Sequence, residues 1–172
     1  APGSDGLKNA LEKVRTLLSH IIIENKQDKL RPIDAYDIVM HISDAVLSGG
    51  VRRSATICIF STDDMEMMKA KTDDWHIQNP QRARSNNSVI LIRDRITYKQ
   101  FKDIMKLVKE HGEPGFIWAD DFEFLVNPCV EIGLYAYDED GNSGWAFCNL
   151  CEINVKRSEE HTSELQSPTN LV

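Results

Sequence analysis

The sequence lacks the features that mark several broad classes of protein. It contains no run of 18 apolar residues, so no segment is expected to span a membrane as a helix. It has 20 basic residues against 27 acidic ones, and a net charge of −7 argues against a broad basic face for nucleic acid. Its four cysteines are irregularly spaced and form no disulfide framework, and no signal peptide is recognisable. These absences predict a cytoplasmic protein that binds neither a membrane nor nucleic acid, and whose cysteines are available for chemistry.

What is present suffices for a folded core, because 41% of the 172 residues are apolar. Segments with helical spacing of apolar residues alternate with short stretches rich in β-branched residues. Helices are expected at residues 5–26, 33–48, 63–71 and 97–110, and strands at residues 54–60, 88–92 and 116–119. Thr97 is the expected N-cap of the last helix, and Ser61 or Thr62 that of the short one. The alternation predicts an α/β fold with a largely parallel sheet.

The most informative stretch is Asn127-Pro128-Cys129-Val130-Glu131. In an extended backbone, Asn127, Cys129 and Glu131 would share one face, each about 7 Å from the next. An amide, a thiol and a carboxylate on one face form a plausible catalytic set, with the carboxylate as the base. Pro128 donates no hydrogen bond, which favours a loop or an edge strand. The spacing alone equally allows a buried cysteine that acts as a small hydrophobic residue.

A second cysteine-bearing stretch, Cys148-Asn149-Leu150-Cys151, has C-x-x-C spacing. This spacing allows half a zinc site or a local redox pair. However, no second pair of ligands exists, and residues three apart on a strand face opposite sides. We therefore predict no metal site. The turn-rich residues 138–144 predict a hairpin with arms at residues 131–137 and 145–153, which would bring Cys148 back toward Cys129.

Four blocks of sequence, taken together, resemble a known family. In chain order they are GGVRRSA at 49–55, NPQRARSNNS at 79–88, NPCVEI at 127–132 and FCNLCEIN at 147–154. Each block alone is weak evidence, but this ordered set resembles the large, catalytic chain of ribonucleotide reductases. The residues in these blocks are most similar to those of the adenosylcobalamin-dependent class II branch, although class I remains an alternative.

The resemblance implies that residues 1–156 are an internal fragment of a ten-stranded α/β barrel whose finger loop carries Cys129. It further implies a radical reduction of ribonucleotides to 2′-deoxyribonucleotides. In that reaction Cys129 would become the thiyl radical, Glu131 the base for the 3′ hydroxyl, and Asn127 a hydrogen-bonding partner of the ribose hydroxyls. Cys148 would be one thiol of the reducing pair, whose partner is missing from the matched region. The fragment alone is expected to be inactive.

The resemblance also implies the ligands and partners. Adenosylcobalamin would be the cofactor, although no residue here is identifiable as binding it. The substrate would be a ribonucleoside di- or triphosphate, with a nucleotide effector, a thioredoxin-like reductant and a homodimeric or monomeric enzyme. Residues 75–87 resemble a specificity loop between effector and substrate base. The candidate contacts in and beside this loop are Gln81, Arg82, Arg84, Asn86 and Asn87, and the alternative is a solvated loop that contacts nothing.

Two further interpretations stay open. The chain could be a non-catalytic, nucleotide-binding regulatory module, which would keep Arg82 and Arg84 but would not need Asn127, Cys129 and Glu131 to converge. Residues 157–172 resemble the translation of a sequencing-library adapter, so they are expected to be non-native and disordered. A genuine disordered tail is the alternative for these residues.

Overall fold

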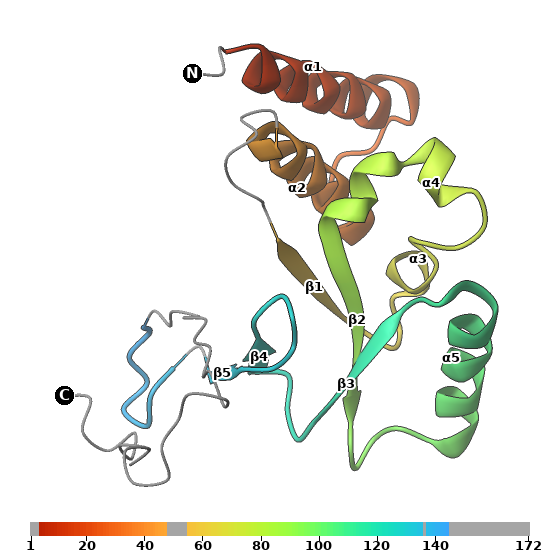
Figure 1. Ribbon diagram of the computed structural model, residues 1–172, viewed down its shortest axis with the longest axis vertical. Coiled ribbons are helices and arrows are strands. Elements are labelled where there is room, and N and C mark those ends of the chain that lie inside the picture. Colours follow the sequence, from red (N-terminus) through yellow and green to blue (C-terminus); the bar gives the residue numbers. More distant parts are fainter. Residues whose placement is uncertain (1–3, 48–54, 136, 145–172) are drawn as a thin grey trace, which may run out of the picture.

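A three-stranded parallel sheet forms the centre of the molecule (Figure 1). The computed structural model describes residues 4–47, 55–135 and 137–144. The strands are β1 (Thr56–Ser61), β2 (Ser85–Ile92) and β3 (Gly115–Ala119), in the order β1-β2-β3. Both pairings are parallel, which confirms the expected α/β fold. These residues contain no barrel.

The helices occupy most of the chain between the strands. They are α1 (Asp5–Ser19), the π-helical turn η1 (His20–Glu24), α2 (Pro32–Leu47), α3 (Met65–Met68), α4 (Trp75–Gln78), the 3₁₀ helix η2 (Pro80–Arg84) and α5 (Tyr98–His111). The segments α3, α4 and η2 connect β1 to β2, and α5 connects β2 to β3. Each connection is a crossover, as a parallel pairing requires.

One face of the sheet holds the main core. Alternate residues of β2 point to opposite faces, and Val89 and Leu91 point to the helical face with no exposed surface. They pack against helical side chains, namely Tyr36, Met40, Met67, Met68 and Ile104. This face therefore joins α2, α3 and α5 to the sheet.

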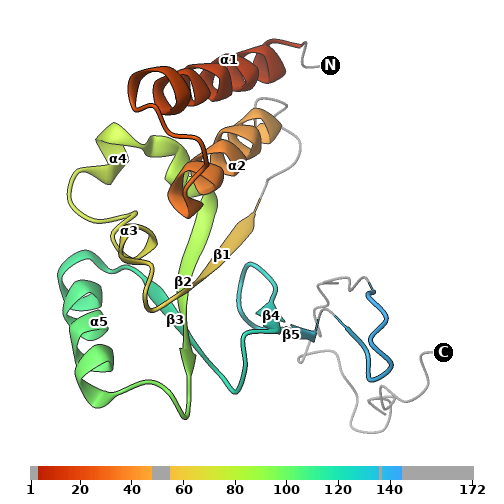
Figure 2. The same cartoon turned by 180° about the vertical axis from the view of Figure 1, so that it is seen from behind.

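The opposite face of the sheet is covered differently. Ile90, Ile92 and Ala119 form a smaller cluster there, and Phe124 packs against it. Phe124 begins β4 (Phe124–Val126), which pairs antiparallel with β5 (Gly133–Tyr135). Figures 1 and 2 show this hairpin and α5 on opposite sides of the sheet. The hairpin thus approaches the face that bears the even-numbered residues of β2.

Helix α1 packs on α2 rather than on the sheet (Figure 1). Its outward surface carries Leu7 and Leu11, which are both 60% exposed. The π-helical turn that follows carries the exposed Ile22 and Ile23. None of the helices in the described ranges is long and apolar enough to cross a membrane.

The ends of two helices show which sequence signals act locally. Thr97 caps α5 through a capping box with Gln100, as expected, and Gly112 ends the helix at φ 74°. The short helix α3 is capped by Asp64, whose carboxylate accepts a hydrogen bond from Met67 N at 2.9 Å. The expectation of Ser61 or Thr62 at this cap is wrong, because the helix begins later than the sequence pattern indicated.

Two strand expectations also need correction. The backbone of residues 127–131 is not extended; the stretch is the loop that connects β4 and β5, which is one of the two possibilities that Pro128 favoured. The expected first hairpin arm, residues 131–137, contains β5, but β5 pairs with the unforeseen strand β4. The turn after β5 is present, since Tyr137 bridges Ser143 and Gly141 N donates to Asp138 O at 3.0 Å. The expected second arm and the tail of residues 157–172 lie outside the described residues.

Candidate functional site

The residues of the NPCVEI motif form a tight turn at the tip of the β4–β5 hairpin. Val130 N donates to Asn127 O at 2.9 Å, so Pro128 and Cys129 are the two central residues of a β-turn. Proline suits the first central position because its ring presets φ, and asparagine suits the position before it. Val130 follows with φ 70°, which turns the chain back toward β5.

This turn places the three predicted catalytic side chains in different surroundings. Asn127 is buried, and its Oδ1 accepts a hydrogen bond from Ile132 N at 3.0 Å. Cys129 and Glu131 are exposed. The expectation that alternate side chains share an extended face is therefore wrong, because the Asn-Pro turn replaces the strand geometry.

A side chain of the second motif reaches this turn. Asn86, at the start of β2, donates from Nδ2 to the carbonyl oxygen of Pro128 at 3.1 Å. The hydrogen bond joins two motifs that are 42 residues apart in the chain. The tertiary structure thus places Asn86 beside the peptide bond that leads into Cys129.

Arg82 and Gln81 face the helix α2 instead. Arg82 donates to Asp37 from Nε at 2.8 Å and from Nη2 at 2.6 Å, and it also donates to the carbonyl oxygen of Ala70 at 2.8 Å. Gln81 Nε2 donates to Asp37 Oδ1 at 3.2 Å. Both ionic side chains are largely buried, at 12% exposure for Arg82 and 10% for Asp37. A substrate contact by Arg82 would require this pair to open.

Asn87 belongs to a buried polar cluster with Tyr36 and Ser85. Tyr36 Oη lies 2.8 Å from Ser85 Oγ and 3.1 Å from Asn87 Oδ1. Burial raises the pKa of the Tyr36 hydroxyl, and its hydrogen bonds to Ser85 and Asn87 act in the opposite direction. Asn87 is 1% exposed, and its Nδ2 has no hydrogen-bond partner within the described part of the chain. Asn87 therefore lies in the interior beneath α2.

The remaining cations of this region are also paired. Arg84 Nε lies 3.1 Å from Asp44 Oδ1, an ion pair whose alignment falls short of a hydrogen bond. The buried Lys71 donates to the carbonyl oxygen of Ser85 and to Glu113 Oε1, the latter at 3.1 Å. The sequence pattern gave no reason to select Tyr36, Asp37 or Lys71, because their partners lie far along the chain.

Cys58 lies in β1 and packs against the main core. Burial raises the pKa of its thiol, and the nearby Asp64 carboxylate raises it further. A thiol in this setting is a poor nucleophile near neutral pH. This placement agrees with a structural role for Cys58.

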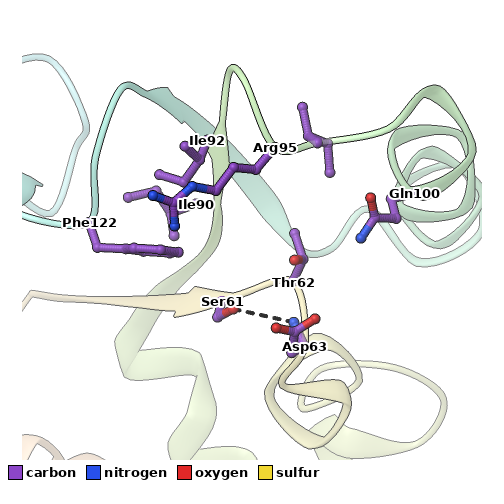
Figure 3. A pocket seen from close by; sticks show the side chains of 9 residues that line it. Ser61, Thr62, Asp63, Ile90, Ile92, Arg95, Gln100 and Phe122 are labelled. Carbon is purple, nitrogen blue, oxygen red and sulfur yellow. Dashed lines mark hydrogen bonds between the residues drawn. The ribbon is translucent and has the colours of Figure 1, made fainter.

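A pocket of about 330 Å³ lies at the opposite end of β2 from the Cys129 turn (Figure 3). It opens where β1 and β2 end, the edge at which parallel α/β sheets commonly bind ligands. Figure 3 shows Arg95 beside Phe122, and its guanidinium lies 5.7 Å from the centre of that ring. The other lining residues are Ser61, Thr62, Asp63, Ile90, Ile92, Ile96 and Gln100. None of the predicted site residues lines this pocket.

Several predicted features lie outside the described residues. These are Cys148 and Cys151, the whole FCNLCEIN block and all but the last residue of the GGVRRSA block. Among the residues that the structure does describe, no group of three or more His, Cys, Asp or Glu side chains could hold a metal ion.

Comparison with curated proteins finds relatives that share one name. The chain is 31% identical over 163 residues to the adenosylcobalamin-dependent ribonucleoside-triphosphate reductase of Lactobacillus leichmannii. It is a distant homologue of the class II ribonucleotide reductases. The proteins of the same name from Lactobacillus helveticus and Lacticaseibacillus paracasei are 28% and 33% identical, over 90% and 72% of the chain.

The matched region is a small part of these reductases. The match covers 84% of the chain but only 20% of the Lactobacillus leichmannii protein, so the chain spans about a fifth of its curated relatives' length. No protein-family model matches the chain, and no solved structure matches it significantly. The evidence for homology therefore comes from the curated reductases.

Proposed function

We propose that this chain forms part of the catalytic barrel of an adenosylcobalamin-dependent ribonucleotide reductase, with the β4–β5 hairpin as its finger loop and Cys129 as the radical residue. The observation that carries the proposal is the position of Cys129 within a matched segment of the reductases. The hairpin approaches a sheet face that carries no helix in the described residues.

Each residue of the motif has a distinct role in the proposed reaction. The sulfur radical of Cys129 takes the hydrogen atom from C3′ of the ribose, so an S–H bond forms as the C3′–H bond breaks. Glu131 takes the proton of the 3′ hydroxyl, and the exposed position of its carboxylate supports access to a substrate. Asn127 would hold the ribose hydroxyls.

The reduction itself requires two electrons from two thiols. The 2′ hydroxyl leaves as water and C2′ gains a hydrogen, with the two electrons and two protons supplied by the two thiols as they join in a disulfide. The Cys129 S–H then returns its hydrogen atom to C3′, which regenerates the sulfur radical. Cys148 is the proposed thiol from this chain. The second thiol would come from the part of the reductase beyond this segment, and the reductant would be a thioredoxin-like protein.

Adenosylcobalamin would generate the radical when it is bound. The described residues around Cys129 form a turn between β4 and β5, and none of them is identified as binding the cofactor. We assign its binding to the remainder of the reductase. This remainder would also exclude water from Cys129, as radical chemistry requires.

The regulatory alternative has less support from the geometry. A nucleotide-binding module would use Arg82 and Arg84 as phosphate contacts, yet both pair with carboxylates of α2. Arg82 is held more firmly than Arg84, because both carboxylate oxygens of Asp37 accept hydrogen bonds from it. The three motif side chains do not converge in the described residues, so support for the catalytic proposal comes from the similarity to the reductases.

Removal of the Cys129 thiol tests the proposed function. In a reductase polypeptide that contains this segment within the length of its relatives, Cys129→Ala should abolish formation of deoxyribonucleotides without unfolding the protein. Product would be measured by chromatography, with adenosylcobalamin, a ribonucleoside triphosphate and a dithiol present. Cys58→Ala is the matched control and should retain turnover. Product formation by Cys129→Ala would refute the assignment, and the 172-residue chain alone should form no product.

A further inference from the structure

The first strand residues of β2 are fixed from the helical face of the sheet. Ser85 and Asn87 point toward α2 and share hydrogen bonds with Tyr36. Lys71 also holds the carbonyl oxygen of Ser85. Asn86, between them, must point to the opposite face because side chains alternate along a strand. Its backbone is thus anchored, while its side chain is directed toward the hairpin.

The amide of Asn86 meets the hairpin at one particular peptide bond. Its Nδ2 donates to Pro128 O at 3.1 Å, and that oxygen belongs to the peptide unit that carries the N–H of Cys129. Because a peptide unit is planar, a hydrogen bond to its oxygen restrains the orientation of the next residue. Asn86 therefore acts on Cys129 through the backbone.

The hairpin's internal hydrogen bonds shape the turn but do not attach it to the sheet. Asn127 N donates to Ile132 O at 3.2 Å, and Ile132 N donates to Asn127 Oδ1 at 3.0 Å. Attachment comes from Phe124 at the base of the hairpin, which packs on Ile90 and Ile92. The bond from Asn86 supplies a second attachment, at the tip.

We propose that Asn86 is a positioning residue for Cys129, rather than a contact of the substrate base. It holds the Pro128–Cys129 peptide against the sheet and so sets where the thiol lies. The inference rests on the proposed function, in which Cys129 carries the radical. Hydrogen-atom transfer depends steeply on distance, so a displaced turn should slow the chemical step more than it weakens substrate binding.

Hydrogen exchange of the 172-residue chain tests the attachment. Asn86→Asp keeps the shape of the side chain but removes the Nδ2 donor. Asn86→Ala removes both the shape and the donor. Each variant should speed exchange at the Val130 and Ile132 amides about five- to tenfold, as expected when one hydrogen bond is lost. Asn9→Ala, an exposed amide on α1, is the matched control and should change exchange less than about twofold. Unchanged exchange in both Asn86 variants would overturn the proposal.

Steady-state kinetics of the complete reductase test the consequence. Asn86→Asp and Asn86→Ala should lower kcat at least about tenfold while KM changes less than about twofold. A raised KM with unchanged kcat would indicate that Asn86 contacts the substrate and would refute the positioning role. An unchanged kcat together with faster hydrogen exchange would also refute it. Turnover by Cys129→Ala would refute the proposed function separately, because the exchange result does not depend on activity.

Discussion

The ion pair between Asp37 and Arg82 shows how single residues acquire their roles. Asp37 lies on α2 and Arg82 on η2, and both are largely buried. A bidentate arginine–carboxylate pair has strong, directional hydrogen bonds. The pair therefore attaches the polar segment before β2 to the helical layer.

Loss of the Asp37 carboxylate should destabilise the fold. Asp37→Ala leaves the Arg82 guanidinium buried without its partner, which should lower the free energy of unfolding by about 3 kcal/mol. Urea unfolding followed by circular dichroism measures this change. Asp120→Ala is the control, since the exposed Arg93–Asp120 pair should contribute less than about 1 kcal/mol. Equal effects of the two substitutions would contradict a special role for the buried pair.

The Asp34 carboxylate should give the fold an acid-sensitive contribution. Asp34 is 4% exposed and accepts hydrogen bonds from Arg31 Nη2 at 2.8 Å and from Arg31 N at 2.9 Å. The side-chain bond from Arg31 holds the pKa of this carboxyl below its ordinary value, although burial opposes the shift. The folded state therefore binds its proton more weakly than the unfolded state does.

The sign of the pH dependence follows from that lowered pKa. The stabilisation is fully present above the unfolded pKa of about 3.9 and is lost as the pH falls through the lower folded value. Asp34→Asn should therefore be less stable at pH 7 and should lose less stability below about pH 4. Thermal unfolding between pH 2.5 and 7 measures this, with the exposed Asp28→Asn as the control. If Asp34→Asn lost as much thermal stability at low pH as the unsubstituted chain, the contribution assigned to Asp34 would be contradicted.

At the scale of elements, α5 has the most complete set of local signals. Gln100 N donates to Thr97 Oγ1 at 3.3 Å, and Thr97 N donates to Gln100 Oε1 at 3.0 Å. Gly112 then adopts the left-handed conformation that ends the helix. These signals depend only on neighbouring residues, which explains why the limits of this helix agree closely with the sequence pattern.

Removal of the α5 cap should weaken the fold by a modest amount. Thr97→Ala deletes the oxygen that accepts from Gln100 N and should lower the free energy of unfolding by about 1 kcal/mol. Thr16→Ala on the exposed surface of α1 is the control and should have an effect within about 0.5 kcal/mol. Chemical unfolding of both variants measures the difference. A loss at Thr16 as large as that at Thr97 would show that capping is not the cause.

At the scale of the whole molecule, the two faces of the sheet differ in what covers them. The helical face holds the main core, with Leu91 completely buried, and the other face meets the hairpin through Phe124. The hairpin thus adds little to the main core. Most of the stability of the described residues should come from the helical face.

Truncation in the main core tests this distribution. Leu91→Ala removes a fully buried side chain and should lower the free energy of unfolding by about 3 kcal/mol. Leu11→Ala on the 60% exposed position of α1 should change it by less than about 0.5 kcal/mol. Both values come from urea unfolding of the same chain. Comparable losses would mean that α1 contributes to the core as much as β2 does.

The sequence by itself determined the α/β class, the approximate limits of α2, α5 and β3, and the relation to the reductases. These features follow from local spacing, caps and ordered motifs. It did not determine the backbone at Cys129, where the turn preference of Asn-Pro prevailed over an alternating pattern. The short strand β4 also escaped detection, because three residues carry too little periodicity.

Only the tertiary structure decided which polar side chains are committed to partners. Asp37 meets Arg82 across 45 residues of sequence, and Asn86 meets Pro128 across 42. No local pattern encodes such contacts, because they exist only after the helices, the sheet and the hairpin have packed together. The motif places Cys129 in a turn, and a side chain of β2, Asn86, contacts that turn through Pro128 O.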